Sequence, residues 1–406
     1  MTAPLSDQPW LTAPATRAVI AALEAAGGPG CARFVGGCVR NALIGRPVAD
    51  IDIATTLQPN ATERAVRAAG LKAVPTGIAH GTVTAVAERT PFEITTLRRD
   101  VSTDGRNATV AFTDDWAEDA ARRDFRLNAL YADAAGQVFD PTGEGVPDAL
   151  AGRIVFVGDP ETRIREDFLR ILRFFRFHAW YGRGEPDAAA LAACQALAPG
   201  MTRLSAERVS SELMKLLSAP DPRAAVRAMA ETAVLDQVLP EAKLTALFDA
   251  AVEQGGDATT RLMMLLPPDE AVARNATTRL RFPNAARASR SLIDRWIAGR
   301  ARAANANRSR AALYRHGRQA VSDAVRRRWA EAPDQGDDAR RLLALAEGWT
   351  RPPLPVGGRE VARLGVEPGP GTGRLLKAFE DAWIADDFPV DGHAERLAAL
   401  VSALRG

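Results

Sequence analysis

The sequence predicts an α+β protein in which a head with a mixed β-sheet precedes an all-α neck, body and tail. Short runs of alternating apolar and polar residues, typical of strands with one solvated face, interleave with helical segments before about residue 140. From about residue 160 onward the apolar residues follow helical spacing, and no further strand is predicted. We therefore place the head at 1–153, the neck at 154–218 and the body with its tail at 219–406.

The elements follow in chain order. A short amphipathic helix over residues 14–26 ends at Gly27-Gly28, a typical stop signal for a helix. Alternation predicts strands over 32–36, 49–55, 82–88, 92–98 and 137–140. Helical spacing predicts helices over 38–44, 59–69 and 117–131 in the head, and over 161–182, 204–218, 222–231 and 241–252 after it.

The composition is that of an ordinary soluble globular protein with two or more domains. The chain has 406 residues, of which 47% are hydrophobic and 25% charged, and its net charge of +2 points to no particular partner. Its three cysteines form no CxxC pair, so we expect a reducing cytoplasm and neither disulfides nor structural zinc. We expect no membrane span, because no stretch approaches ~20 apolar residues, and no signal peptide, because the N-terminus lacks a basic segment followed by an apolar one.

The most informative motif is a pair of carboxylates that follows a glycine turn. Asp50 and Asp52 lie in the alternating stretch VADIDIAT, so both side chains project from one face of a strand. Two carboxylates on one face repel each other unless a cation lies between them, and such oxygen clusters suit Mg²⁺ with substrate phosphates in its remaining positions. The preceding Gly36 and Gly37 offer bare backbone N–H groups that can hold phosphates. The combination indicates a metal-dependent reaction of a nucleoside triphosphate.

A basic segment lies in the C-terminal half. Fifteen arginines, but only two acidic residues and no lysine, fall within residues 274–328. One interpretation is a contact with a nucleic-acid backbone, for which the candidates are Arg302, Arg308, Arg310 and Arg315. The other interpretation is a compositional bias on a solvated helical surface.

Four longer motifs carry a family resemblance. They are GGCVRN at 36–41, EDAARRDFRLNAL at 118–130, REDFLRILRFFRF at 165–177 and RLSAERVSSEL at 203–213. With the carboxylate pair, they resemble the motifs of the class II tRNA nucleotidyltransferases (CCA-adding enzymes) and the related bacterial poly(A) polymerases. The matching residues run from about 34 to 213, half of the chain. The resemblance implies that the head has a nucleotidyltransferase fold of the polymerase β type and that the neck carries a base-template helix.

The resemblance also implies roles for single residues. Asp50 and Asp52 would be catalytic and would hold Mg²⁺, which polarises the α-phosphate and lowers the pKa of the attacking RNA 3′-hydroxyl. Glu93, on a neighbouring strand, would add a third catalytic carboxylate, although a surface glutamate is the alternative interpretation. The implied nucleotide-binding residues are Gly36, Gly37, Arg40, Arg123, Asp124, Asn128, Asp167, Arg170, Arg173 and Arg176.

Within this set, Asp167 and Arg170 are implied to act as a protein template for the incoming base. They follow one another with Arg173 and Arg176 at three-residue steps, which predicts one polar stripe on a helix; a plain amphipathic helix gives the same pattern. An Asp acceptor beside an Arg donor can pair with cytosine or adenine, whereas uracil and guanine present their donor and acceptor groups in the opposite order. Asn41 stands where the family has Asp, and we expect its amide to make a structural bond in the turn.

The implied function is the addition of CCA to the 3′ end of tRNA by a transferase that uses CTP, ATP and Mg²⁺ and has no obligatory protein partner. The helical part would bind tRNA by shape and phosphate contacts. The alternatives are a poly(A) polymerase, an A-only adding enzyme, or a non-catalytic RNA-binding protein. Poly(A) polymerases of the family usually carry a segment rich in arginine and histidine after the third strand, whereas residues 97–115 contain no histidine and end in acidic residues. That difference favours CCA addition, and we expect residues 100–115 to form a mobile loop.

Overall fold

The computed structural model describes residues 5–78, 81–104, 107–267, 269–282 and 306–405. The chain divides into two compact units, Met1–Pro240 and Glu241–Gly406, each of which is described by itself below. The first unit contains a mixed sheet followed by helices, and the described part of the second unit is helical, which confirms the predicted α+β class. The limits predicted for head, neck and body at 153 and 218 stay a prediction.

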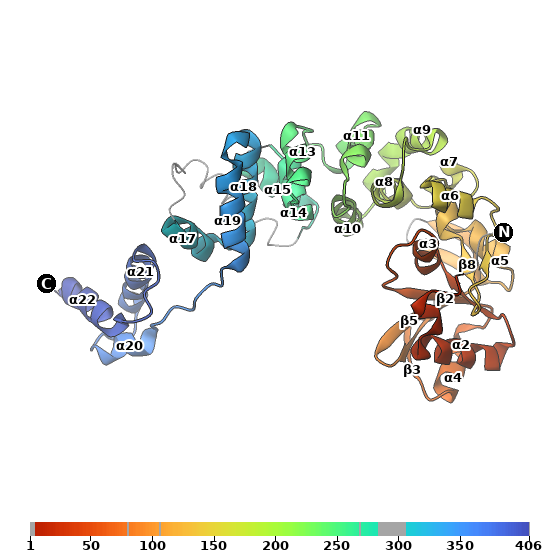
Figure 1. Ribbon diagram of the computed structural model, residues 1–406, viewed down its shortest axis with the longest axis horizontal. Coiled ribbons are helices and arrows are strands. Elements are labelled where there is room, and N and C mark those ends of the chain that lie inside the picture. Colours follow the sequence, from red (N-terminus) through yellow and green to blue (C-terminus); the bar gives the residue numbers. More distant parts are fainter. Residues whose placement is uncertain (1–4, 79–80, 105–106, 268, 283–305, 406) are drawn as a thin grey trace. The chain divides into compact units, whose positions relative to one another are not determined.

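The head is built on a seven-stranded sheet with the order β3-β4-β5-β2-β1-β8-β9. Strands β2, β3, β5 and β8 of this sheet are labelled in Figure 1. Its strands are β1 (Ala32–Val35), β2 (Ile51–Thr55), β3 (Lys72–Gly77), β4 (Thr82–Ala87), β5 (Thr90–Thr96), β8 (Tyr131–Ala132) and β9 (Val138–Phe139). Strands β2 and β5 are parallel, and every other neighbouring pair is antiparallel. The five predicted strands are all present. Alternation misses β3, which contains Pro75 and has no fully buried residue, and the two-residue β8.

Three predicted helices surround this sheet. Helices α2 (Pro14–Gly27) and α4 (Pro59–Ala68) contact each other and β4, and the buried face of α2 includes Val19, Ile20 and Leu23. Helix α3 (Gly37–Leu43) follows β1 directly and contacts both β1 and β2. The helix thereby returns the chain to the sheet so that the strand carrying the carboxylates lies beside the glycine turn.

Residues 117–131 do not form the single helix that their spacing predicts. They form α5 (Trp116–Ala121), a 3-10 turn over Arg126–Asn128 and the start of β8. Tertiary packing outweighs helix propensity here, because Phe125 is fully buried and its ring lies 4.8 Å from that of Phe156, with which it also forms a backbone bridge.

The loop predicted over residues 100–115 is largely a hairpin, and its mobility stays a prediction. Most of them belong to an antiparallel hairpin of β6 (Arg98–Asp104) and β7 (Asn107–Phe112) that is separate from the main sheet. The stretch contains several β-branched residues, including Val101, Thr103 and Val110, which favour strands. The charged and glycine residues between them hide that signal in the sequence.

After the head, the first unit is helical. Its helices are α6 (Gly145–Ala151), α7 (Pro160–Glu166), α8 (Leu169–Tyr181), α9 (Ala188–Leu197), α10 (Ala206–Leu217), α11 (Arg223–Glu231) and α12 (Val234–Val238). The predicted helix over 161–182 is therefore two helices. The break lies at Asp167, which is extended and whose side chain accepts a hydrogen bond from the backbone N–H of Leu169 at 3.1 Å. An Asp side chain that bonds the nearby backbone competes with a continuous helix in this way.

The second unit contains helices around two apolar clusters. They are α13 (Ala246–Glu253), α14 (Ala258–Leu265), α15 (Glu270–Arg279), α17 (Ala306–His316), α18 (Arg318–Glu331), α19 (Gly336–Gly348), α20 (Gly358–Arg363), α21 (Pro370–Ala385) and α22 (His393–Arg405). Leu313, Val321 and Val325 belong to one cluster, and Phe379 and Trp383 to the other. Across both units, none of the described helices is long and apolar enough to span a bilayer.

Candidate active site

Three carboxylates meet at the centre of the head sheet. Asp50 immediately precedes β2, Asp52 lies within it, and the parallel register places Glu93 of β5 directly beside Asp52. Burial, followed by the charges of Glu93 and Asp50, raises the pKa of the Asp52 carboxyl to about 6, and Arg123 acts in the opposite direction. The structure therefore brings the three predicted carboxylates together and places a guanidinium near them. Asp50 and Glu93 are exposed, so an approaching ligand can reach them.

The carboxylates fit a divalent cation that shares its coordination with a substrate. Within the described residues, no three His, Cys, Asp or Glu side chains converge closely enough to form a metal site by themselves. Mg²⁺ is usually bound by one or two carboxylates plus substrate phosphates, so an incomplete protein site is what this ion requires. A cation beside Asp52 would also offset the repulsion that raises its pKa.

The glycine turn and Arg123 border the same space. Gly36 has a φ of 72°, a left-handed conformation that favours glycine, and it leads into α3 at Gly37. A Cβ on Gly36 would lie 3.7 Å from Nη1 of Arg123 and 3.6 Å from the carbonyl oxygen of Asn128. A side chain at position 36 would therefore fill the space next to the guanidinium, where phosphate oxygens can lie.

Arg40 projects from α3 and connects the head to α8. It is only 6% exposed, and it donates hydrogen bonds to the amide oxygen of Asn128 and, at 2.7 Å, to the hydroxyl of Tyr181. Its guanidinium carbon lies 4.0 Å from the centre of the Tyr181 ring. Burial lowers the pKa of Arg40, and the main opposing influence comes from Tyr181. These contacts indicate that Arg40 positions Asn128 and Tyr181, in addition to being a candidate ligand of the nucleotide.

The expected structural role of Asn41 is confirmed. Its side-chain oxygen accepts a hydrogen bond from Nη2 of Arg40 at 2.9 Å, and its amide nitrogen donates to the carbonyl of Pro47 at 3.0 Å. The amide thus both orients Arg40 and closes the turn after α3. An aspartate would accept from Arg40 but would have no proton to donate to Pro47 when ionised.

A buried acid, Asp119, holds Arg123 in place. Its carboxylate accepts hydrogen bonds from Nη2 of Arg123 at 2.9 Å and from the hydroxyl of Tyr131 at 2.7 Å. Burial by itself would raise the pKa of Asp119, but Arg123, Arg122 and the Tyr131 hydroxyl lower it to about 2. Sequence reasoning misses Asp119, although its spacing of four residues from Arg123 is the signal of a side-chain pair on one turn.

Asp124 joins the head to α8 through Arg173. It is 8% exposed and accepts hydrogen bonds from Nε of Arg173 at 2.7 Å and from the Asn128 amide at 3.0 Å. Burial opposes ionisation, but Arg173 and the hydrogen bonds lower the pKa of Asp124 to about 2, and the pKa of Arg173 is raised. The predicted neighbours Asp124 and Asn128 do meet, across a 3-10 turn instead of along a helix.

The residues of the implied base template are each fixed by a different partner. Asp167 accepts a hydrogen bond of 2.6 Å from Arg208 of α10. Arg170 donates to Glu166 and, at 2.9 Å, to the carbonyl of Arg163. Because Asp167 precedes α8, the predicted polar stripe of four residues on one helix is wrong. Three arginines, at positions 170, 173 and 176, form the stripe on α8, and the template role stays a prediction.

Arg208 is a second residue that sequence reasoning misses, although it lies in the RLSAERVSSEL motif. The same helix supplies Glu212, which is 4% exposed and has its Oε2 atom 2.7 Å from Nε of Arg176. Helix α10 therefore supplies charged partners for both Asp167 and Arg176.

The structure describes the side chains of two of the four arginines predicted to bind RNA. Arg302 and the side chain of Arg308 lie outside the described residues. Arg310 donates to Asp387 at 2.7 Å, and Arg315 donates to Asp381 at 3.1 Å. Both described side chains thus have partners within the second unit, and their contact with RNA stays a prediction.

Comparison with known proteins gives a consistent result. Residues 32–155 match the family model of the poly A polymerase head domain, and residues 185–244 match that of a probable RNA and SrmB-binding site of polymerase A. The human protein CCA tRNA nucleotidyltransferase 1, mitochondrial, is 32% identical over 362 residues, 86% of this chain and 82% of the human one. A CCA-adding enzyme of Streptococcus pyogenes is 41% identical over 200 residues, 49% of this chain and 48% of its own. The crystal structure of the Bacillus stearothermophilus CCA-adding enzyme in complex with CTP aligns with a TM-score of 0.74 at 26% identity, covering 97% of this chain and 98% of that one.

Proposed function

The chain belongs to the family of CCA tRNA nucleotidyltransferases, and on this premise we propose that it adds C, C and A in turn to the 3′ end of tRNA, using CTP and ATP. The observation that carries the proposal is that Asp50, immediately before β2, and Asp52, within it, lie beside Arg123. Carboxylates that bind a metal next to a fixed cation are what a triphosphate requires for transfer of its α-phosphate.

We propose Asp50 and Asp52 as ligands of Mg²⁺ and Glu93 as the catalytic carboxylate beside them. When bound, Mg²⁺ polarises the α-phosphate and favours the ionised form of the attacking 3′-hydroxyl. Arg123, fixed by Asp119, offers positive charge to the triphosphate along the edge of the Gly36 turn. Asp124 stays ionised at neutral pH and keeps the Arg173 guanidinium in one orientation.

We propose that Asp167 and Arg170 select the incoming base. The carboxylate of Asp167 accepts a hydrogen bond from the exocyclic amino group of cytosine or adenine, and Arg170 donates one to the neighbouring ring nitrogen. Uracil and guanine leave both groups mispaired, which costs about 1–3 kcal/mol for each unsatisfied buried group. The structure supports this proposal because both side chains have fixed positions. Arg208 holds Asp167 at the helix break, and Glu166 holds Arg170 on α8.

A nucleotide-incorporation assay tests the proposal. A tRNA transcript that lacks CCA is offered with Mg²⁺ and one labelled nucleoside triphosphate at a time. The expected result is incorporation of CTP but not of UTP or GTP, with a loss of at least about 100-fold in Asp50→Asn and Asp52→Asn. Asp114→Asn, which removes an exposed acid of the head, is the matched control and should keep full activity. Full activity of Asp52→Asn would contradict the metal assignment.

We also propose a cytoplasmic location. The three cysteines are free and buried, as expected for a protein in a reducing compartment. The human and mouse relatives are named as mitochondrial proteins. Cell fractionation with a tagged chain decides between the two compartments.

A further inference from the structure

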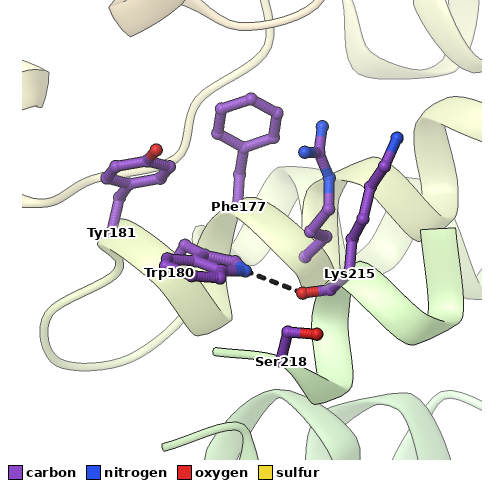
Figure 2. Close-up of a pocket in the computed structure, with 6 residues that line it drawn as sticks. Phe177, Trp180, Tyr181, Lys215 and Ser218 are labelled. Atoms are coloured by element: carbon purple, nitrogen blue, oxygen red, sulfur yellow. Dashed lines mark hydrogen bonds between the residues drawn. The ribbon is translucent and has the colours of Figure 1, made fainter. Parts of the chain in front are cut away.

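A pocket of about 270 Å³ lies between the C-terminal end of α8 and the C-terminal end of α10 (Figure 2). It is lined by Arg176, Phe177, Trp180, Tyr181, Lys215 and Ser218. In Figure 2 the Phe177 and Lys215 side chains extend in the same direction from neighbouring helices, with Trp180 between Tyr181 and Lys215. Among these residues, only Arg176 is a predicted nucleotide ligand, and Tyr181 contacts the nucleotide site through Arg40. The other four lining residues have no role in that site.

Trp180 is the aromatic ring of this pocket that is available for stacking. Tyr181 already has the Arg40 guanidinium 4.0 Å from its ring centre, and Phe177 is only 5% exposed. Among the described residues, no aromatic ring or cation lies against the Trp180 ring. Its Nε1 donates to the carbonyl of Lys215 at 2.7 Å, which fixes the ring at the pocket wall (Figure 2). A fixed, half-buried indole at the wall of a pocket is suited to stack on a nucleobase.

The charge of the pocket suits a phosphate group. Arg176 lies 2.7 Å from Glu212, and Lys215 lies 3.3 Å from the same carboxylate. Two cations therefore share a single anion. The guanidinium groups of Arg40 and Arg46 also lie 4.0 Å and 4.8 Å from the centre of the Tyr181 ring. The pocket thus carries an excess of positive charge, which suits a phosphate group.

The pocket also adjoins the nucleotide site through hydrogen bonds. Tyr181 accepts from Arg40, Arg40 donates to Asn128, and Asn128 donates to Asp124. The volume of the pocket lies just below the ~300–1,000 Å³ typical of small-ligand sites, so it has room for about one nucleotide.

We propose that this pocket binds one nucleotide of the single-stranded acceptor end of the RNA, with its base stacked on Trp180 and its phosphate held by Lys215. The inference rests on the proposed function, which requires an RNA 3′ end next to the nucleotide site. It assigns to Trp180 and Lys215 a role in holding the RNA, separate from the residues that hold the incoming nucleotide.

The test measures RNA binding without nucleotide or metal. The probe is a fluorescent stem-loop RNA that ends in a single-stranded CC, and its anisotropy gives Kd. Trp180→Leu, which keeps apolar bulk but removes the aromatic face, should weaken binding about ten-fold, and Trp180→Phe should stay within about two-fold. Lys215→Gln should weaken binding about five-fold and reduce its salt dependence. Lys72→Gln, at an exposed position on β3, is the matched control and should bind normally.

Steady-state kinetics then separate the RNA from the nucleotide. Trp180→Leu should raise KM for the RNA while KM for CTP and kcat at saturating RNA stay unchanged. An unchanged Kd in both Trp180→Leu and Lys215→Gln would overturn the inference, and so would a raised KM for CTP with normal RNA binding, because the pocket would then take the free nucleotide. If the unaltered protein added no nucleotide at all, the proposed function would fail, whereas the anisotropy result would still decide whether the pocket binds RNA.

Discussion

Arg208 donates a hydrogen bond of 2.6 Å to the carboxylate of Asp167, across the interface between α10 and the break that separates α7 from α8. The second carboxylate oxygen accepts from the backbone N–H of Leu169. Asp167 is therefore held at both oxygens before any base arrives. A template whose side chains are fixed in advance loses little conformational entropy on binding. It can distinguish the bases by the order of donor and acceptor groups along their edges.

Removal of Arg208 should weaken base selection. In Arg208→Gln the Asp167 side chain loses its charged partner, so KM for CTP and ATP should rise, and discrimination against UTP and GTP should fall about ten-fold. Single-turnover incorporation of each of the four nucleotides measures the effect. Arg165→Gln, an exposed arginine on α7, is the control. Unchanged discrimination in Arg208→Gln would mean that Asp167 needs no such support.

Asp124→Asn should destabilise the first unit. The substitution leaves Arg173 without its anionic partner, and we expect the free energy of unfolding to fall by about 2–3 kcal/mol at pH 7. Because the folded-state pKa of Asp124 is lowered to about 2, its stabilising contribution is complete above the unfolded value of about 4 and is lost as pH falls from there towards 2. Urea unfolding of both proteins at pH 7 and pH 3 should therefore show a smaller difference at pH 3. If the two proteins differed equally in free energy of unfolding at pH 7 and pH 3, the charge of Asp124 would not be the cause of the destabilisation.

Asp52→Asn should have the opposite effect in the absence of divalent metal. The pKa of Asp52 is raised to about 6 in the folded state, so its ionisation opposes folding. That cost is absent below about pH 4, develops as pH rises through 6, and is complete above it. At pH 8 in a chelator, the free energy of unfolding of Asp52→Asn should therefore exceed that of the unaltered protein by up to about 3 kcal/mol, and at pH 4.5 the difference should be small. Addition of Mg²⁺ at pH 8 should stabilise the unaltered protein more than the variant, and a variant less stable than the parent in chelator at pH 8 would contradict the assignment.

The two described arginines of the basic segment should respond differently. Arg315 is exposed, with 45% of its side chain accessible, whereas Arg310 is 28% accessible and forms a two-pronged contact with Asp387. If the second unit binds the RNA backbone, Arg315→Gln should weaken tRNA binding a few-fold and lower the slope of log K against log salt by about one. Arg310→Gln should mainly lower the melting temperature. A normal salt slope in Arg315→Gln would favour compositional bias as the origin of the arginines.

The sequence predicts the parts of the site that depend on local pattern. Alternation places Asp50 and Asp52 on one strand face, and the positive φ of Gly36 agrees with the glycine turn inferred from the motif. Local pattern does not show where a chain folds back on itself. Arg208 is missed for this reason, because it contacts Asp167 from 41 residues away. Asp119 is four residues from Arg123, so its role could have been inferred from that spacing.

The wrong expectations have a similar physical origin. The single helix predicted over 117–131 does not form, because burial of Phe125 against Phe156 holds the backbone at Phe125 in an extended conformation. The helix predicted over 161–182 breaks where the Asp167 side chain bonds the backbone. In each case a contact made by one side chain outweighs a helical periodicity that is present in the sequence.

The order in which the protein adds nucleotides to tRNA can be measured directly. Three tRNA transcripts, ending before CCA, after C and after CC, are each incubated with the purified protein, Mg²⁺, and labelled CTP, ATP or both. We expect two C additions and then one A, followed by a stop, on the first transcript, and correspondingly shorter additions on the other two. Addition of A alone to the CC end, long A tracts on unrelated RNA, or no incorporation on any transcript would each contradict this expectation.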